Sequence, residues 1–221
     1  MKGLKFYDQG HIYTLDGEEI PSVSELSRFA SREIYNNDIS KFVLDKACER
    51  GTAVHKASEI LDKTGKAEIA PQYIEYINAY IQYHNDYNIK DYLYIEEPFA
   101  SREIGYAGTL DRVYIIDEDF AKTAKKQCKV DLTDKIGQMA IIDLKTSCAV
   151  KKPLAQIQLP AYARLLKENI KENQVGALFI LHLKKDGKYK MMYFENDLTL
   201  FDSCVNLHKA LAHKKRRKKN G

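Results

Sequence analysis

The 221-residue sequence contains no tryptophan and only four cysteines, and no two of these cysteines form a C-x-x-C pair. Zinc knuckles and disulfide frameworks need such pairs or a denser set of cysteines, so the sequence favours free thiols. No stretch approaches the roughly 20 consecutive apolar residues of a membrane-spanning helix. The opening MKGLKFYDQG also lacks the apolar segment of a signal peptide. We therefore expect a cytoplasmic protein that does not bind a membrane.

Charge of both signs is plentiful but unevenly distributed along the chain. Hydrophobic residues make up 44% and charged residues 30% of the sequence, with a net charge of +4, which is typical of a folded globular protein. Residues 1–212 have a length that suits a single domain. The run HKKRRKK at 213–219 predicts a disordered basic tail over 213–221. Such a tail either contacts phosphates or is simply a solvated end.

Hydrophobic periodicity predicts an α/β fold with a mixed central β-sheet flanked by helices. Residues 1–38 form an N-terminal extension in this prediction, with a hairpin at HIYTLDGEEI followed by a helix. Further helices are expected at 39–62, 71–87, 153–169 and 197–212, and strands at 92–100, 105–116, 138–146, 175–183 and 188–196. The polar insertion at 117–137 shows no clear periodicity, so we expect a loop or a small hairpin there.

Two charged residues, Asp143 and Lys145, interrupt the apolar stretch AIIDLKTS. Because side chains alternate along a strand, both charges lie on the same face. A buried ion pair is the structural alternative, but such pairs are costly to desolvate and seldom needed for stability, so a functional site is favoured. Asp111 interrupts the neighbouring predicted strand in the same way. Two carboxylates on adjacent strands repel each other unless a cation lies between them, which predicts a divalent-cation site.

Two more candidate ligands lie upstream of these strands. Strict alternation along YIEEPF places Glu97 on the same face as Ile95 and Phe99, so we choose Glu97 and expect Glu96 at the solvated surface. His55 lies on the apolar stripe of the long predicted helix, where an imidazole can be a metal ligand. A single histidine in such a position is more often an ordinary core residue, and both interpretations of His55 stay open at this point.

In combination, these segments resemble the PD-(D/E)XK nuclease superfamily, and within it the RecB-like exonuclease branch. The matching segments are GTAVH at 51–55, EEPF at 96–99, GTLD at 108–111, DLK at 143–145 and QLPAY at 158–162. The opening HIYTLDGEEIPSVSEL is also similar to small phage-encoded members of this branch, although Asp111 has no proline before it. The resemblance implies a restriction-endonuclease-like αβββαβ core. It also implies a metal-dependent DNA nuclease, most often an exonuclease in phage-type recombination or repair.

The resemblance further implies a role for each residue. The implied ligands of Mg²⁺ or Mn²⁺ are His55, Asp111, Asp143, the backbone carbonyl of Leu144 and, for the same or a second ion, Glu97. The implied catalytic residues are Asp111, Asp143, Glu97 and Lys145. Lys145 would orient the attacking water and stabilise the transition state. The candidate DNA contacts are Gln158 and Tyr162, which share one helix face, together with Thr146 and Arg112.

Two other functions stay open beside the exonuclease. A catalytically silent DNA-binding module has no need to retain Asp111, Asp143 and Lys145 together, which argues against it. A structure-specific endonuclease on the same fold is not separated from an exonuclease by the sequence. The cysteine spacing does not match the iron–sulfur members of the branch, so no cluster is expected. DNA is the expected partner, a recombination or annealing protein is a further candidate, and the expected setting is a bacterial or phage-infected cell.

Overall fold

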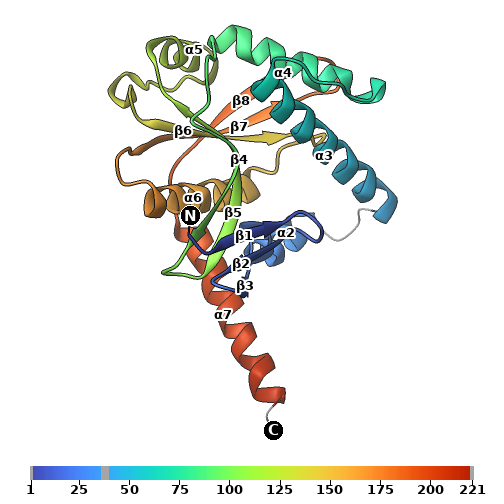
Figure 1. Cartoon of the computed structure of the whole chain (residues 1–221), viewed down its shortest axis with the longest axis vertical. Helices are drawn as coiled ribbons and strands as arrows, with labels where there is room; N and C mark the ends of the chain where they lie inside the picture. The colour runs from blue at the N-terminus through green and yellow to red at the C-terminus, as the bar shows by residue number, and fades with distance from the viewer. Residues whose placement is uncertain (1, 36–39, 220–221) are drawn as a thin grey trace.

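A five-stranded mixed β-sheet forms the centre of the protein, with strand order β4-β5-β6-β7-β8 (Figure 1). The computed structural model describes residues 2–35 and 40–219, with the side chains of the last helix described as far as residue 212. The strands are β4 (Tyr94–Ser101), β5 (Tyr106–Ile115), β6 (Met139–Lys145), β7 (Val175–Leu183) and β8 (Tyr189–Phe194). Only β6 and β7 pair in parallel within this sheet. The predicted α/β fold with a mixed central sheet is therefore confirmed.

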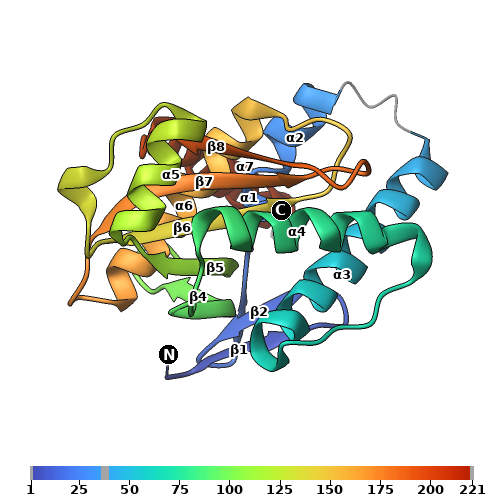
Figure 2. The same ribbon diagram turned by 90° about the horizontal axis from the view of Figure 1, so that it is seen from above.

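Helices cover both faces of the sheet (Figures 1 and 2). One face packs against α3 (Lys41–Thr64), α4 (Ile74–Tyr87) and α5 (Glu118–Cys128). The other face packs against α1 (Val23–Leu26), α6 (Lys152–Asn169) and α7 (Thr199–Lys219), with α2 (Arg28–Tyr35) beside α6. Two 3₁₀ turns, Pro71–Tyr73 and Thr133–Lys135, complete the helical segments. None of the described helices is long and apolar enough to span a membrane.

Local sequence signals explain where several elements begin and end. Ser22 caps α1, because its Oγ accepts the backbone N–H of Glu25 at 3.0 Å. Gly65 ends α3 with a φ of 75°, a left-handed conformation that glycine adopts without strain. The helix α6 connects β6 to β7, and these two strands pair in parallel. A crossover helix of this kind packs on one face of the sheet.

The N-terminal extension is a small antiparallel sheet that packs on the β4-β5 hairpin (Figure 1). Its strands are β1 (Leu4–Tyr7), β2 (Ile12–Leu15) and β3 (Glu18–Ile20). The predicted hairpin corresponds to β2 and β3, whose turn contains Asp16 and Gly17 with φ values of 54° and 92°. Tyr13 of β2 is buried against Ala100 and Ala107 of the central sheet. The extension therefore lies beside the strand that carries Asp111.

The polar insertion at 117–137 contains a helix, so the expectation of a loop or hairpin is wrong. The helix is α5, and the Asp117 carboxylate caps it by accepting the backbone N–H of Phe120 at 2.8 Å. Phe120, Ala121 and Ala124 are buried against the sheet. The apolar stripe of this helix is only three residues long among many lysines and acids, which explains why no periodicity was evident.

The last helix also differs from its prediction, because α7 continues through the basic run to Lys219 instead of ending at residue 212. The run contains no proline or glycine to stop a helix, and cations near a helix C-terminus interact favourably with its dipole. Figure 1 shows α7 extending away from the sheet. The side chains of 213–219 lie outside the described residues, so their contact with phosphate stays a prediction.

Candidate active site

The site lies where β5 and β6 separate. β5 pairs with β4 along almost its whole length, but it pairs with β6 only from Arg112 to Ile115. Beyond that point, the backbone of β6 forms hydrogen bonds with side chains where it would otherwise pair with β5. The backbone N–H of Leu144 donates to Asp111 Oδ2 at 2.7 Å, and its carbonyl oxygen lies 3.2 Å from His55 Nε2. Buried backbone groups need partners, so the fork in the sheet itself draws Asp111 and His55 together.

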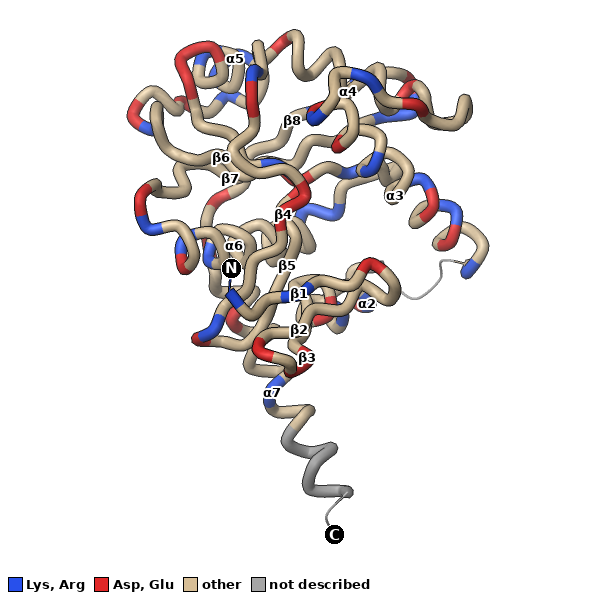
Figure 3. Tube along the Cα trace, in the orientation of Figure 1, with Lys and Arg blue, Asp and Glu red and all other residues tan. Residues whose placement is uncertain are grey.

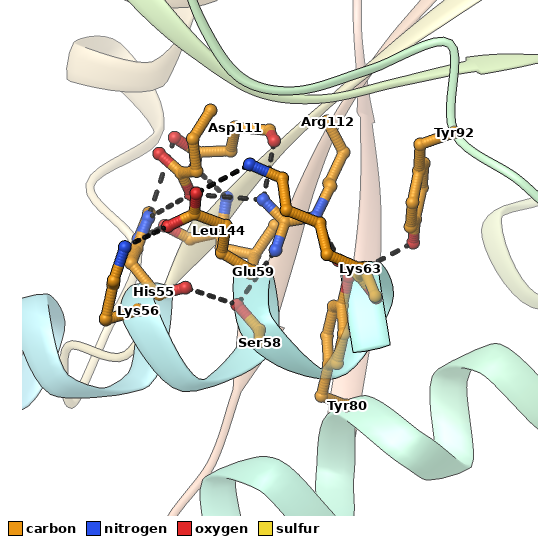
Figure 4. Close-up of polar contacts among 12 residues, drawn as sticks. His55, Lys56, Ser58, Glu59, Lys63, Tyr80, Tyr92, Asp111, Arg112 and Leu144 are labelled. Atoms are coloured by element: carbon orange, nitrogen blue, oxygen red, sulfur yellow. Dashed lines mark hydrogen bonds and ion pairs between the residues drawn. The ribbon is translucent and has the colours of Figure 1, made fainter. Parts of the chain in front are cut away.

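Three side chains with oxygen or nitrogen donors meet at this fork, and Figure 4 labels His55 and Asp111 among them. One donor atom from each of His55, Glu96 and Asp111 lies within 4.8 Å of the other two. His55 Nδ1 is 3.2 Å from Glu96 Oε1 and 3.6 Å from Asp111 Oδ1. One imidazole with two carboxylates is a donor set that divalent cations such as Mn²⁺ bind well, so these residues fit a metal ion.

The electrostatics of the fork also favour a cation. Burial opposes the positive charge of His55, but the carboxylates of Asp111 and Glu96 outweigh it and raise the pKa of His55 to about 9. Burial raises the pKa of Asp111 and of Asp143, while the ammonium of Lys145 opposes both shifts. Without a metal, the imidazolium of His55 therefore supplies the positive charge that these carboxylates need.

Asp143 and Lys145 lie on the strand next to this cluster and share one face of β6, as alternation predicts. Lys145 Nζ lies 2.5 Å from Asp143 Oδ2, and the Lys145 side chain is 35% exposed while that of Asp143 is 6% exposed. Burial raises the pKa of Asp143, the ammonium of Lys145 lowers it, and the carboxylate of Asp111 raises it further. The pair thus adds a buried carboxylate and an accessible ammonium beside the donors of the fork.

Tyr162 of α6 lies next to the site, on the face of the sheet that α6 covers. Burial and the carboxylates of Asp143 and Asp111 raise the pKa of Tyr162 well above its usual range, so its hydroxyl stays protonated and can donate. Gly108 makes room for the ring, because a Cβ at that position would lie 2.7 Å from Tyr162 Cε1. The glycine of the GTLD segment is therefore needed for close packing between β5 and α6.

Glu96 belongs to the cluster, and the expectation that Glu97 would do so is wrong. Glu97 is exposed, whereas Glu96 has a left-handed φ of 49° and points into the fork. The regular alternation of β4 is interrupted there, because Tyr94 and Phe99 pack on the same core although one position is even and the other odd. A parity argument along the sequence cannot detect such a switch of faces.

Arg112 and Thr146 do not lie where DNA could reach them, which corrects two predicted DNA contacts. Arg112 is 0% exposed, and its Nε donates to Asp62 Oδ2 at 2.6 Å. Thr146 is buried, and its Oγ1 accepts from Arg50 Nε at 3.4 Å. Asp62 supplies a buried counter-ion for the arginine, and nothing in the local sequence around Arg112 identifies that partner fifty residues away.

Gln158 and Tyr13 complete the surroundings of the site. Gln158 is half-buried, and its Nε2 donates to Ser27 Oγ at 3.5 Å; its contact with DNA stays a prediction. Tyr13 was not expected here, but its hydroxyl lies 2.8 Å from Thr109 Oγ1. Burial and the nearby carboxylates raise the pKa of Tyr13 to about 12. The N-terminal sheet therefore contributes a residue close to the fork, which the hairpin sequence alone does not reveal.

Fold and site together define a mixed α/β protein with a carboxylate–imidazole cluster at a fork in its sheet. The sequence matches no family model and no curated protein. Solved structures do match, and one of them is a crystal structure of a "Putative exonuclease" from Eubacterium rectale. It shares 15% sequence identity with this chain at a TM-score of 0.49, and the match covers 91% of this chain and 82% of the other. The inference of function therefore depends on the geometry of the site itself.

Proposed function

We propose that this protein is a divalent-metal-dependent nuclease that hydrolyses phosphodiester bonds in DNA. The observation that carries the proposal is the fork between β5 and β6. There the donors of His55, Glu96 and Asp111 converge, and Asp143 with Lys145 lies on the adjacent strand. Several carboxylates beside one accessible ammonium suit the binding of a cation and of the anionic phosphate that it attracts.

Magnesium or manganese fits the donor set best. The residues that would hold the ion are His55, Glu96, Asp111, Asp143 and the carbonyl of Leu144. Carboxylate and carbonyl oxygens suit both metals, and the imidazole nitrogen makes manganese acceptable as well as magnesium. When bound, the ion would stabilise negative charge on the phosphate and lower the pKa of a water molecule. In this proposal Glu96, and not Glu97, is the glutamate that binds the ion.

The other side chains of the site have roles that follow from their charge and position. Lys145 is the partly exposed cation of the site, so it is placed to hold the attacking water and a phosphate oxygen by donating hydrogen bonds. Tyr162 keeps its proton beside Asp143 and Asp111, so its hydroxyl can donate to a substrate oxygen. These donors would gather charge-assisted hydrogen bonds where negative charge develops in the transition state.

We further propose that the enzyme is an exonuclease of the RecB-like branch of the PD-(D/E)XK superfamily. The support is the order of the motifs GTAVH, GTLD, DLK and QLPAY along the chain. In this proposal it acts in the cytoplasm of a bacterial or phage-infected cell, in recombination or repair, and a recombination or annealing protein is its candidate partner. Whether cleavage starts at an end or within a strand is decided by the experiment below.

The test is cleavage of end-labelled linear duplex, single-stranded and closed circular DNA with magnesium, manganese or EDTA. The intact protein should release nucleotides from linear DNA only when a metal is present. Asp143→Ala and Lys145→Ala should lose this activity, whereas Glu97→Gln, which changes an exposed carboxylate, should retain it. Cutting of closed circles would identify an endonuclease. DNA binding without cleavage in either metal would identify a silent binding module and overturn the proposal.

A further inference from the structure

A fully buried arginine lies directly beneath the site (Figure 4). Arg112 is 0% exposed, and each of the three nitrogens of its guanidinium donates a hydrogen bond. Its Nη1 donates to Glu96 Oε1 at 3.0 Å and to the Asp111 carbonyl at 2.6 Å. Its Nη2 donates to Ser58 Oγ at 3.0 Å, and its Nε donates to Asp62 Oδ2 at 2.6 Å. The planar guanidinium thus has a fixed orientation relative to Glu96.

The charge of this arginine is balanced on the side away from the site. Asp62 is 2% exposed, so its carboxylate and the guanidinium form a buried ion pair. The Tyr80 hydroxyl donates to Asp62 Oδ2 at 2.8 Å, and the rings of Tyr80 and Tyr92 lie 5.8 Å and 5.7 Å from the guanidinium carbon. Buried pairs of this kind are rarely needed for stability, so their presence under a functional site calls for another explanation.

The contacts of Glu96 in this network reach one of its oxygens. Glu96 Oε1 accepts from Arg112 Nη1 at 3.0 Å and lies 3.2 Å from His55 Nδ1. Oε1 is therefore both the oxygen that faces the imidazole of the cluster and the oxygen that Arg112 holds. The backbone of Glu96 is also in a left-handed conformation, with φ at 49°, which persists only where surrounding contacts enforce it. Glu96 therefore presents Oε1 to the cluster in a fixed direction.

We propose that Arg112 is a positioning residue that restricts Glu96 to one-oxygen coordination and thereby makes the site favour magnesium or manganese over calcium. This inference rests on the proposed function, because it requires that the fork binds a metal ion. Calcium takes about 6–8 oxygen ligands and often both oxygens of one carboxylate, whereas magnesium requires near-octahedral geometry with one oxygen from each. A guanidinium that holds Oε1 of Glu96 in place opposes the rotation of the carboxylate that would bring both of its oxygens to calcium.

The experiment compares the dissociation constants of Mn²⁺ and Ca²⁺ by isothermal titration calorimetry on the full chain. Arg112→Lys keeps the positive charge but loses the planar guanidinium group, which donates hydrogen bonds to both Glu96 and Asp62. Manganese affinity should fall by about 10- to 100-fold, the usual effect of losing a residue that orients a ligand. Calcium affinity should fall less, so the ratio of calcium to manganese affinity should rise. Loss of packing alone would weaken both metals equally.

A matched control and a second variant keep the test decisive. Tyr80→Phe removes a hydroxyl that contacts the same guanidinium and Asp62 away from Glu96, so it should leave the affinity ratio unchanged. The double variant Asp62→Asn with Arg112→Gln removes both buried charges and leaves neither unpaired, so it stays available if Arg112→Lys does not fold. Its ratio should also rise.

The outcomes separate the inference from the proposed function. If the intact protein binds manganese and the ratio is unchanged in a folded Arg112 variant, the positioning role is overturned while the metal site stands. If the intact protein binds neither ion, the proposed function itself fails, and this inference fails with it.

Discussion

The two parts of β5 have different neighbours, and this difference determines where the charged side chains of the site gather. From Arg112 to Ile115 β5 pairs with β6, and Arg112 and Val113 also pair with β4. From Tyr106 to Leu110 it pairs with β4 and not with β6, and Ala107 also forms a bridge to Ser22. Where β5 no longer pairs with β6, the backbone of Leu144 in β6 bonds instead to the side chains of Asp111 and His55.

The comparison teaches that the site is built from an interruption of regular structure. Buried N–H and C=O groups seldom stay unpaired, so a strand that leaves its neighbour creates a demand for polar side chains. Figure 3 shows acidic and basic residues interspersed along the described chain. The charged residues proposed to bind metal and phosphate are those gathered at the fork.

The largest effect should come from removing the carboxylate next to the fork. Asp143→Asn keeps the size of the side chain but loses its charge, and DNA cleavage should fall by about 10²- to 10³-fold or more, as when one preorganised electrostatic group is lost. Release of labelled nucleotides with manganese measures it. An Asp143→Asn protein that binds DNA and cleaves it at the unmodified rate would contradict the assignment.

The second prediction compares the effects of changing Glu96 and Glu97, two consecutive residues of β4, on metal binding. Glu96→Gln should weaken manganese binding by about 10- to 100-fold, because a side chain held at the metal site is changed. Glu97→Gln should leave binding unchanged, because that carboxylate is exposed and does not belong to the donor cluster. Calorimetric titration of both variants checks this pair. A larger loss of manganese affinity in Glu97→Gln than in Glu96→Gln would show that Glu97 is the metal ligand, as strict alternation predicts.

The third prediction concerns pH, and its sign follows from His55. The pKa of His55 is raised from 6.5 to about 9, so without metal its protonation stabilises the fold fully below pH 6.5, and this stabilisation is lost as pH rises through about 9. A metal ion needs the neutral imidazole, so manganese affinity should rise over the same window, by at most about tenfold per pH unit.

Two measurements check these opposite trends. Thermal unfolding with EDTA follows the stability of the metal-free protein, and calorimetry in buffers of different ionisation enthalpy counts the protons released on binding. His55→Gln should flatten both profiles. A manganese affinity that is constant across the window in the unmodified protein would show that His55 does not lie at the metal.

The smallest effect should come from the part of β6 that pairs with a strand on both sides. Ile142 is fully buried and pairs with Arg112 across β5 and β6. Ile142→Val should lower the free energy of unfolding by about 0.5–1.5 kcal/mol through lost packing. Urea unfolding measures this change, and manganese affinity of the folded variant should be unaltered. A large loss of metal affinity would show that this part of β6 and the fork are not independent.

The sequence predicts the strands and most helices because each buries a regular stripe of side chains. It also identifies the carboxylates Asp111 and Asp143, since charges in apolar strands are conspicuous, and the side chains of Asp143 and Lys145 share a face as alternation requires. It does not locate Glu96, because β4 changes face at that residue. Alternation holds only where the strand is regular.

Other features depend on partners that are distant in the sequence. Arg112 looked available for phosphate, but Asp62 and Glu96 bury its charge. The helix α5 has a cap at Asp117 and a short apolar stripe, a signal that the surrounding lysines obscured. Tyr13 reaches the fork only because the N-terminal sheet packs on β5. Tertiary contacts of this kind have no local signature in the chain.

The central claim is that the fork between β5 and β6 holds the metal ion, and a crystal structure with manganese tests it most directly. Anomalous scattering locates manganese without reference to the protein. The account predicts a peak within coordination distance of His55, Glu96 and Asp111, beside Asp143. A peak elsewhere, or none at the fork in crystals of protein that cleaves DNA with manganese, would contradict it.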